Sequence, residues 1–218
     1  MKRFIASTAM GLLLASNVFA LDISDKAKEL AKNTIIIDTH IDVPYRLNDG
    51  WVDVTVATDN GDFDYPRALK GGLNAPFMSI YTPASLDGTP EAKAHAERMI
   101  GIVEKIVATA PDKFQIAHSV SDVKTYFEKG IIALPMGMEN GSPINGNLDN
   151  INYFHNRGIR YVTLAHSKAN GISDSSYDTN KKWGGLSDFG VKAIKRMNDV
   201  GIMVDISHVS DVAFWEVM

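Results

Sequence analysis

The sequence predicts an α/β fold in which the strands of a parallel sheet alternate with helices. Five apolar, β-branched or aromatic runs are separated by segments with helical periodicity, and this alternation is typical of βαβ units with right-handed crossovers. Each run begins almost continuously apolar, as strands buried on both faces do, and each ends in polar or charged residues. The five runs are Thr34–Asp42, Leu73–Tyr81, Ile131–Glu139, Ile159–His166 and Ile202–His208.

The polar ends of these runs favour a TIM (β/α)8 barrel, because active-site residues of that fold gather at the carboxyl ends of its strands. A doubly wound sheet is the alternative, but no Gly-x-Gly-x-x-Gly turn follows any run. A barrel needs eight strands and typically about 250 residues, whereas this 218-residue sequence stops at Met218, early in the expected fifth helix. We therefore expect residues 21–218 to be the N-terminal part of a single barrel domain, truncated to about five βα units.

Two helices are predicted between the second and third runs. The Thr-Pro-Glu segment at 89–91 supplies an N-cap, a proline in the first turn and an acidic residue, so a helix should run from there to about Ala110. Ser119 and Asp122 resemble a capping box for a shorter helix that ends near Gly130.

Two further helices are expected over Asn147–Arg157 and Ser187–Asp199, the second closed by Gly201. Residues 43–72 and 167–186 have no clear period and are rich in Gly, Asn, Asp and Ser. We interpret these two segments as long loops after strands, which is where active-site lids tend to lie.

Residues 1–20 have the layout of a secretory signal peptide. Lys2 and Arg3 supply positive charge, an apolar stretch from Phe4 to about Ala15 follows, and cleavage is expected after about Ala20. The stretch is shorter than the roughly 20 residues of a spanning helix, which disfavours the alternative of a membrane anchor. We therefore expect export to the periplasm or the cell exterior.

The composition excludes several classes of chemistry and partner. The chain has no cysteine, so disulfides, a lipidated cysteine and a thiol nucleophile are excluded, and no Gly-x-Ser-x-Gly motif supports a serine nucleophile. Its net charge is -4, with both signs mixed and no basic run, which gives no reason to expect nucleic acid as a partner. No segment after the first twenty residues is apolar enough to span a bilayer.

A metal site is indicated first by His40 and Asp42, two residues apart at the end of the first run. Alternate residues of a strand point to the same side, so both side chains can reach one ion. Asp38 shares that face one step deeper and could orient a ligand. A surface polar pair is the ordinary alternative, but three isoleucines before the pair put it at the mouth of a buried strand.

Three more candidates end later runs. Glu139 ends the third run, where its two oxygens could bridge two metals; an exposed acid opening a loop is the alternative. His208 ends the fifth, and its neutral imidazole suits zinc. His166 ends the fourth and could donate a hydrogen bond to the oxyanion of a tetrahedral intermediate, bind metal, or be a buried partner of Ser167. The remaining histidines are expected on the solvated surface; these are His95, His118 and His155.

At this point five segments resemble successive motifs of the membrane (renal-type) dipeptidase family, peptidase family M19 of the metal-dependent amidohydrolases. The segments are IIIDTHIDVPYRL, LPMGMENGSPI, IRYVTLAHSKANGISDSS, GLSDFGVKAIKRMN and GIMVDISHVSD. The resemblance runs from about residue 24 to the end, and the order and spacing of all five motifs agree.

The resemblance implies a TIM barrel that hydrolyses dipeptides with water activated by two Zn²⁺ ions. His40 and Asp42 would bind one zinc, Glu139 would bridge both, and His208 would bind the second. His166 corresponds to the family's histidine that contacts substrate and stabilises the intermediate. Members of the family often form homodimers, so a homodimer is a further expectation.

The sequence also departs from the family's pattern. The second histidine on the second zinc, the arginine that holds the substrate carboxylate and the aspartate that carries the proton lie further on in the family and have no counterpart here. We therefore expect a second zinc site that lacks a ligand, in a chain that is an inactive or incomplete fragment. A non-catalytic remnant, or another amidohydrolase such as a lactonase or deaminase with the same ligands, remains the alternative.

Overall fold

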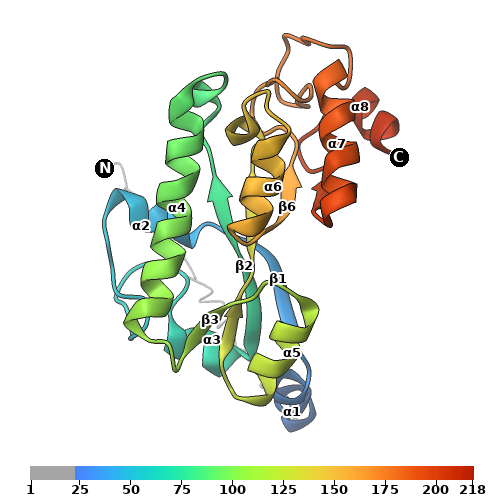
Figure 1. The fold of residues 1–218 in the computed structure, drawn as a ribbon. Helices are drawn as coiled ribbons and strands as arrows, with labels where there is room; N and C mark the ends of the chain where they lie inside the picture. The colour runs from blue at the N-terminus through green and yellow to red at the C-terminus, as the bar shows by residue number, and fades with distance from the viewer. Residues whose placement is uncertain (1–22) are drawn as a thin grey trace, which may run out of the picture.

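The computed structural model describes residues 23–218, and the expected signal peptide at 1–20 lies outside them (Figure 1). The first helix, α1 (Asp25–Asn33), precedes the sheet and was not predicted. Ser24 caps it, because its hydroxyl accepts a hydrogen bond from the backbone N–H of Ala27 at 3.3 Å. Within residues 23–218, no helix is both long enough and apolar enough to cross a membrane.

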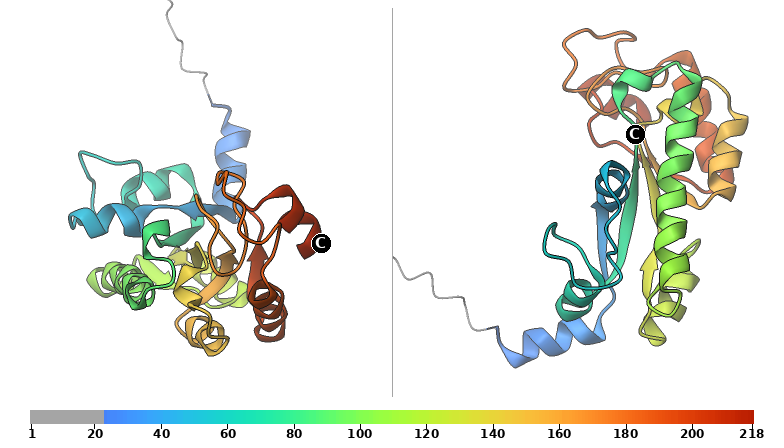
Figure 2. Two further views of the ribbon diagram at one scale, coloured as in Figure 1. Left: turned by 90° about the horizontal axis from the view of Figure 1, so that it is seen from above. Right: turned by 90° about the vertical axis from the view of Figure 1, so that its left-hand side faces the viewer.

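The five predicted runs form one parallel sheet with the strand order β1-β2-β5-β6-β7. The sheet is curled like half of a barrel, which confirms the predicted fold class. Helices α4 (Pro90–Thr109), α6 (Asp149–Asn156) and α7 (Asp188–Val200) lie in an arc outside the strands when the molecule is seen from above (Figure 2). The strands are β1 (Ile36–Ile41), β2 (Leu73–Tyr81), β5 (Met136–Glu139), β6 (Ile159–Thr163) and β7 (Met203–Asp205).

The four predicted helices are present, each within a few residues of its expected bounds. The expected fifth helix, early in which the sequence stops, is present as well, whereas two short 3-10 turns were not predicted. The predicted helices are α4 (Pro90–Thr109), α5 (Val120–Glu128), α6 (Asp149–Asn156) and α7 (Asp188–Val200). The fifth helix is α8 (Asp211–Val217), and the two turns are η1 (Ala84–Leu86) and η2 (Ser142–Ile144).

The prediction of one continuous third strand is wrong. Residues 131–139 form two strands, and β4 (Ile132–Leu134) pairs with β3 (Phe114–Ile116) in a separate two-stranded sheet, while β5 enters the main sheet. Pro135 lies between β4 and β5 and cannot donate a ladder hydrogen bond, although its carbonyl still accepts from the N–H of Met78 at 2.8 Å. The strand therefore changes partners at the proline.

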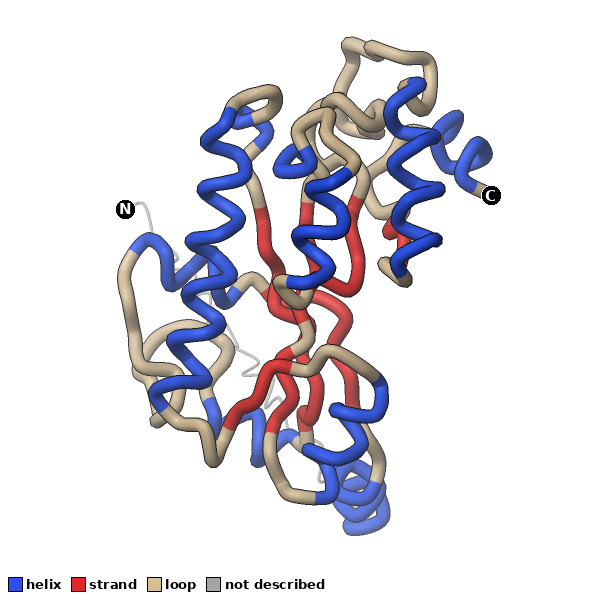
Figure 3. Tube along the Cα trace, in the orientation of Figure 1, coloured by secondary structure: helices blue, strands red, loops and turns tan. Residues whose placement is uncertain are grey.

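The segment 43–72 is less irregular than predicted, because it contains α2 (Val43–Asp49) and α3 (Tyr65–Gly71) (Figure 3). Asp64 caps α3: its carboxylate accepts hydrogen bonds from the backbone N–H groups of Arg67 and Thr58, both at 2.9 Å. Each of these helices has 7 residues, fewer than two full turns. Neither helix is long enough to show an apolar period in the sequence.

The two faces of the sheet differ in chemistry, as the alternation of side chains along a strand requires. In β2, Met78 and Ile80 are fully buried and pack with the helices. The alternate residues Phe77, Ser79 and Tyr81 lie on the other, concave face, which also carries the candidate site residues at its upper edge. The fold therefore separates an apolar helix-facing core from a concave face that presents polar groups.

Candidate metal centre

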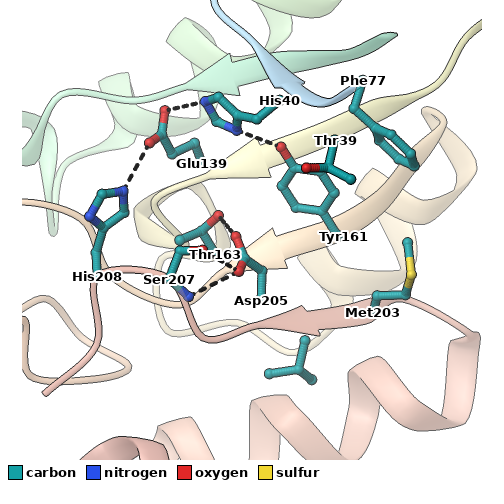
Figure 4. A pocket seen from close by; sticks show the side chains of 11 residues that line it. Thr39, His40, Phe77, Glu139, Tyr161, Thr163, Met203, Asp205, Ser207 and His208 are labelled. Carbon is teal, nitrogen blue, oxygen red and sulfur yellow. Dashed lines mark hydrogen bonds and ion pairs between the residues drawn. The ribbon is translucent and has the colours of Figure 1, made fainter. Parts of the chain in front are cut away.

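The five residues singled out in the sequence lie together at the carboxyl ends of β1, β5, β6 and β7. They form two groups whose ligand atoms all lie within 4.8 Å of one another, one of His40, Asp42 and Glu139 and the other of Glu139, His166 and His208. Glu139 belongs to both groups and lies between the imidazoles of His40 and His208 (Figure 4). A cavity of about 360 Å³ adjoins them and is lined by His40, Glu139 and His208 among others.

The carboxylate of Glu139 offers one oxygen to each group. Its Oε2 lies 3.2 Å from Nε2 of His40, while its Oε1 lies 3.4 Å from Nε2 of His166 and 3.5 Å from Nε2 of His208. Two ligand atoms on one tetrahedral zinc, with bonds of about 2.0–2.2 Å, are about 3.4 Å apart. The donor types and their separations therefore fit a divalent cation on each side of Glu139.

Glu139 is buried, with 7% of its surface exposed, so the alternative of an exposed acid at the start of a loop does not apply. Ser79 in the neighbouring strand donates a hydrogen bond to its Oε2 at 3.2 Å. The next residue, Asn140, has a left-handed backbone with φ 74°, and its side-chain amide donates to the carbonyl of Thr82 at 2.8 Å. The turn after β5 is thus fixed immediately beside the carboxylate.

His40 is near the end of β1, and Asp42 is the residue that precedes α2. Nε2 of His40 lies 3.5 Å from Oδ1 of Asp42. Asp38, which was predicted to orient a ligand, contacts His40 through the main chain: its carboxylate accepts from the backbone N–H of His40 at 3.0 Å. The imidazole itself bonds through Nδ1 to the hydroxyl of Tyr161 at 2.8 Å.

His166 and His208 lie three residues beyond the ends of their strands, not at the ends as predicted, because β6 stops at Thr163 and β7 at Asp205. The turn that carries His208 is closed by Asp205, whose Oδ1 accepts from the N–H and the hydroxyl of Ser207 at 2.9 and 2.7 Å. His208 then has a left-handed backbone with φ 66°, and its carbonyl accepts from the N–H of Ser176 at 2.8 Å.

The imidazole of His166 is held by packing. Its ring meets Tyr81 and His208 edge to face, with centroids 5.0 and 4.6 Å apart. Its Nδ1 is buried and has no hydrogen-bond partner among the described residues, so the interpretation of His166 as a buried partner of Ser167 has no support in the structure.

The carboxylates make the site favourable for positive charge. Hydrogen bonding to Asp42, and then to Glu139, raises the pKa of His40 to about 10, and the same contact with His40 lowers the pKa of Asp42. Burial lowers the pKa of His166, which favours its neutral form. A cation held between Asp42 and Glu139 would take up the stabilisation that the protonated imidazole receives here.

Sequence reasoning missed several residues that shape the site. Tyr161 could have been suspected from strand alternation with Thr163, but Ser79 gave no motif or spacing signal. The expectation that His95 is solvated is wrong, since it is buried with 6% of its surface exposed. His95 lies in the long helix α4 between Ala94 and Ala96. Alanine occurs on buried and exposed helix faces alike, so these neighbours do not indicate which face His95 occupies.

Comparisons with known proteins agree on one family. The model of the family described as membrane dipeptidase (peptidase family M19) matches residues 24–218. Among curated relatives, the dipeptidase tcpJ of Claviceps purpurea is 33% identical over 160 residues, which is 70% of this chain and 38% of that protein. The dipeptidase verJ of Clonostachys rogersoniana is 28% identical over 200 residues, which is 85% of this chain and 51% of that protein.

Solved structures give the same result for the fold. The probable dipeptidase PvdM from Pseudomonas aeruginosa superposes with a TM-score of 0.79 at 29% identity, over 88% of this chain and 51% of that one. A metallo peptidase from Rhodobacter sphaeroides, solved with a phosphinate mimic of L-Ala-D-Ala, superposes with a TM-score of 0.73 at 23% identity, over 84% of this chain and 61% of that one. The chain thus spans about half the length of the relatives it matches.

Proposed function

This chain belongs to the membrane dipeptidase family, peptidase family M19, and from that premise we propose that its five-residue site is the two-zinc centre of a hydrolase that cleaves dipeptides. The observation that carries the proposal is the buried carboxylate of Glu139, which offers one oxygen to each of two donor groups. A single carboxylate in that position is suited to bridge two ions. The curated relatives named above are dipeptidases, which supports the substrate class.

In this proposal His40 and Asp42 would hold the first zinc, His208 would hold the second, and Glu139 would be a ligand of both. Bound zinc supplies Lewis acidity, lowering the pKa of water and polarising a carbonyl oxygen. The second group has only Glu139 and His208 once His166 is reserved for substrate, so the second zinc would be held more weakly. Two Zn²⁺ ions of unequal affinity are therefore expected.

His166 has the role of substrate contact. Its Nε2 lies 3.4 Å from Oε1 of Glu139. Burial lowers the pKa of the imidazole, which favours its neutral form near pH 7. A neutral imidazole protonated on Nε2 donates one hydrogen bond, which can stabilise an oxyanion as it forms on the substrate carbonyl. The edge of Tyr81 limits the ring to this orientation.

We further propose that the 218-residue chain by itself binds zinc but turns over dipeptides poorly. A dipeptide carries a free carboxylate, and among the described residues no lysine or arginine lines the cavity beside Glu139. The same proposal includes cleavage of dipeptides by the whole protein and export through the segment at 1–20. It also includes the assignment of residues 21–218 to a single barrel domain and the formation of a homodimer.

Zinc binding tests the metal centre. The zinc-free chain, dialysed against zinc and analysed for metal, should bind one ion tightly and a second weakly, and a chelator should remove both. His40→Ala should abolish the tight binding, because one of three ligands is lost, whereas His118→Ala, at an exposed position, should leave it unchanged. A wild-type chain that takes up no zinc would contradict the assignment.

Cobalt substitution tests the substrate class in the same preparation. Co²⁺ in place of zinc gives visible absorption that responds to changes in coordination, and addition of a dipeptide should shift it. A response to lactones or to nucleobase amines, with none to dipeptides, would favour the lactonase or deaminase alternative. No response to any of these compounds would favour a non-catalytic remnant.

A further inference from the structure

Tyr161 is the one residue outside the five whose side chain bonds directly to a ring of the proposed zinc site in the described part of the chain. Its hydroxyl lies 2.8 Å from Nδ1 of His40 (Figure 4). The other ring nitrogen, Nε2, faces the carboxylates of Asp42 and Glu139 at 3.5 and 3.2 Å. The imidazole therefore has one nitrogen directed at the metal position and the other at a phenol.

The phenol is held in a fixed position by its surroundings. Only 7% of Tyr161 is exposed, and its ring packs on that of Phe77 with centroids 5.4 Å apart. The ring crosses the adjacent strand over Gly137, its register partner in β5. A methyl group at Gly137 would lie 2.0 Å from Cζ of Tyr161, so a glycine is required here for the ring to lie against the sheet.

This arrangement determines which ring nitrogen of His40 is free to bind a metal ion. A histidine that binds zinc through Nε2 is neutral and carries its proton on Nδ1, and that proton must find an acceptor if it is buried. The Tyr161 oxygen, 2.8 Å away, is at the distance of a normal hydrogen bond. Accepting the Nδ1 proton fixes both the tautomer and the rotation of the ring, as the partners of metal-bound histidines generally do.

The contrast with His166 is informative. Its Nδ1 is buried without a hydrogen-bond partner in residues 23–218, so this ring has no counterpart of the Tyr161 hydroxyl. The two histidines are thus equipped differently, although both face Glu139.

We propose that Tyr161 is a positioning residue for the first zinc ligand, its oxygen accepting the Nδ1 proton of His40 so that Nε2 is presented to the ion. Gly137 serves the same purpose by leaving room for the phenol ring. The proposal rests on the proposed zinc centre. It goes beyond that centre by assigning a role to two residues that belong to neither group of candidate ligands.

Tyr161→Phe removes only the hydroxyl and keeps the ring that fills the space over Gly137. We expect the zinc affinity of the tighter site to fall about 10–100-fold, the usual cost of losing such a partner, and the weaker site to be unaffected. Competition with a chromophoric chelator measures both affinities. Tyr153→Phe, on the outer face of α6 and 39% exposed, is the matched control and should bind zinc as the wild type does.

A spectroscopic measurement on the wild type does not depend on any variant. In the zinc-loaded chain with ¹⁵N-labelled histidine, His40 should show zinc on Nε2 and a slowly exchanging proton on Nδ1, with the signal identified by its loss in His40→Ala. Tyr161→Phe should make that proton exchange faster. Far-UV circular dichroism checks that the Tyr161→Phe variant is folded. If Tyr161 only supported the fold, a folded variant would show the same exchange rate of the Nδ1 proton as the wild type.

The outcomes separate this inference from the proposed function. If the wild type binds no zinc, the zinc centre itself fails. If it binds zinc but His40 is ligated through Nδ1, or if Tyr161→Phe leaves both the tighter affinity and the Nδ1 proton unchanged, the role of Tyr161 is overturned and the zinc centre stands.

Discussion

Replacing Glu139 with glutamine should lower the zinc affinity of both sites by at least about 100-fold, because loss of a direct ligand should cost more than the roughly 10–100-fold that follows loss of a supporting partner. A glutamine side chain has one carbonyl oxygen and one NH₂ group, and the NH₂ group cannot bind a cation. Either the His40 side or the His208 side must therefore face a nitrogen that repels the ion. The negative charge shared by the two sites is lost as well.

The measurement is metal content after equilibrium dialysis, with affinities from chelator competition. Glu128→Gln is the matched control, since Glu128 is exposed at the end of α5 and should behave as the wild type. Glu139→Asp separates charge from reach: it keeps the carboxylate but shortens the side chain by one methylene, so it should retain more zinc than the glutamine variant and less than the wild type. Retention of both ions by Glu139→Gln would show that Glu139 is not the bridge.

The fold was predictable because its main signals are repeated along the chain. The apolar runs around Ile36, Ile80 and Val162 each identify a strand of the parallel sheet, and the polar residues that follow them identify the edge where the site lies. Since parallel strands end at the same edge, residues as distant in the chain as His40 and His208 could be expected to meet there from the sequence alone.

What could not be predicted depends on contacts between distant segments. A proline at position 135 is a sequence signal for a break in the third run. The consequence of the break is that β4 pairs with β3 while β5 joins the main sheet, and this depends on where β3 lies. Asp38 was predicted to support His40 and Tyr161 was not, and only the packing of β6 beside β5 brings the tyrosine to the His40 ring. Strand alternation predicts which face a side chain occupies, and it does not predict its partner.

Asp174 is the clearest example, because a residue to which the sequence analysis assigned no role organises the loop beside the site. It is fully buried, and its two carboxylate oxygens accept from four consecutive backbone N–H groups at 2.7–3.2 Å. Its carbonyl also accepts from the N–H of Ser210 at 3.0 Å. Nearby, Ser176 donates through its N–H to the carbonyl of His208 at 2.8 Å, so this loop supports the turn that carries a proposed zinc ligand. The four N–H groups belong to Lys182, Trp183, Gly184 and Gly185.

Asp174→Asn should lower the free energy of unfolding by about 3 kcal/mol at neutral pH, since hydrogen bonds to a charged acceptor contribute about 1.5–3 kcal/mol each and a buried group left unpaired adds a penalty. The asparagine NH₂ group would face backbone N–H groups in place of an acceptor. Urea unfolding measures the loss, and Asp199→Asn, at an exposed position in α7, should be nearly neutral. Amide hydrogen exchange should accelerate most at residues 182–185.

The same carboxylate predicts how the loss depends on pH. Burial acts to raise the pKa of Asp174, but the hydrogen bonds from the N–H groups of Lys182 and its neighbours outweigh it and hold the pKa below its usual range. A carboxyl whose pKa is lower in the folded chain stabilises the fold above its unfolded pKa of about 3.9, and this contribution disappears as the pH falls through the folded value. The difference between wild type and Asp174→Asn should therefore be full at pH 7 and shrink below about pH 4. A difference that stays constant down to acid pH would mean that shape, and not the charge that gathers the four N–H groups, is what the loop requires of this residue.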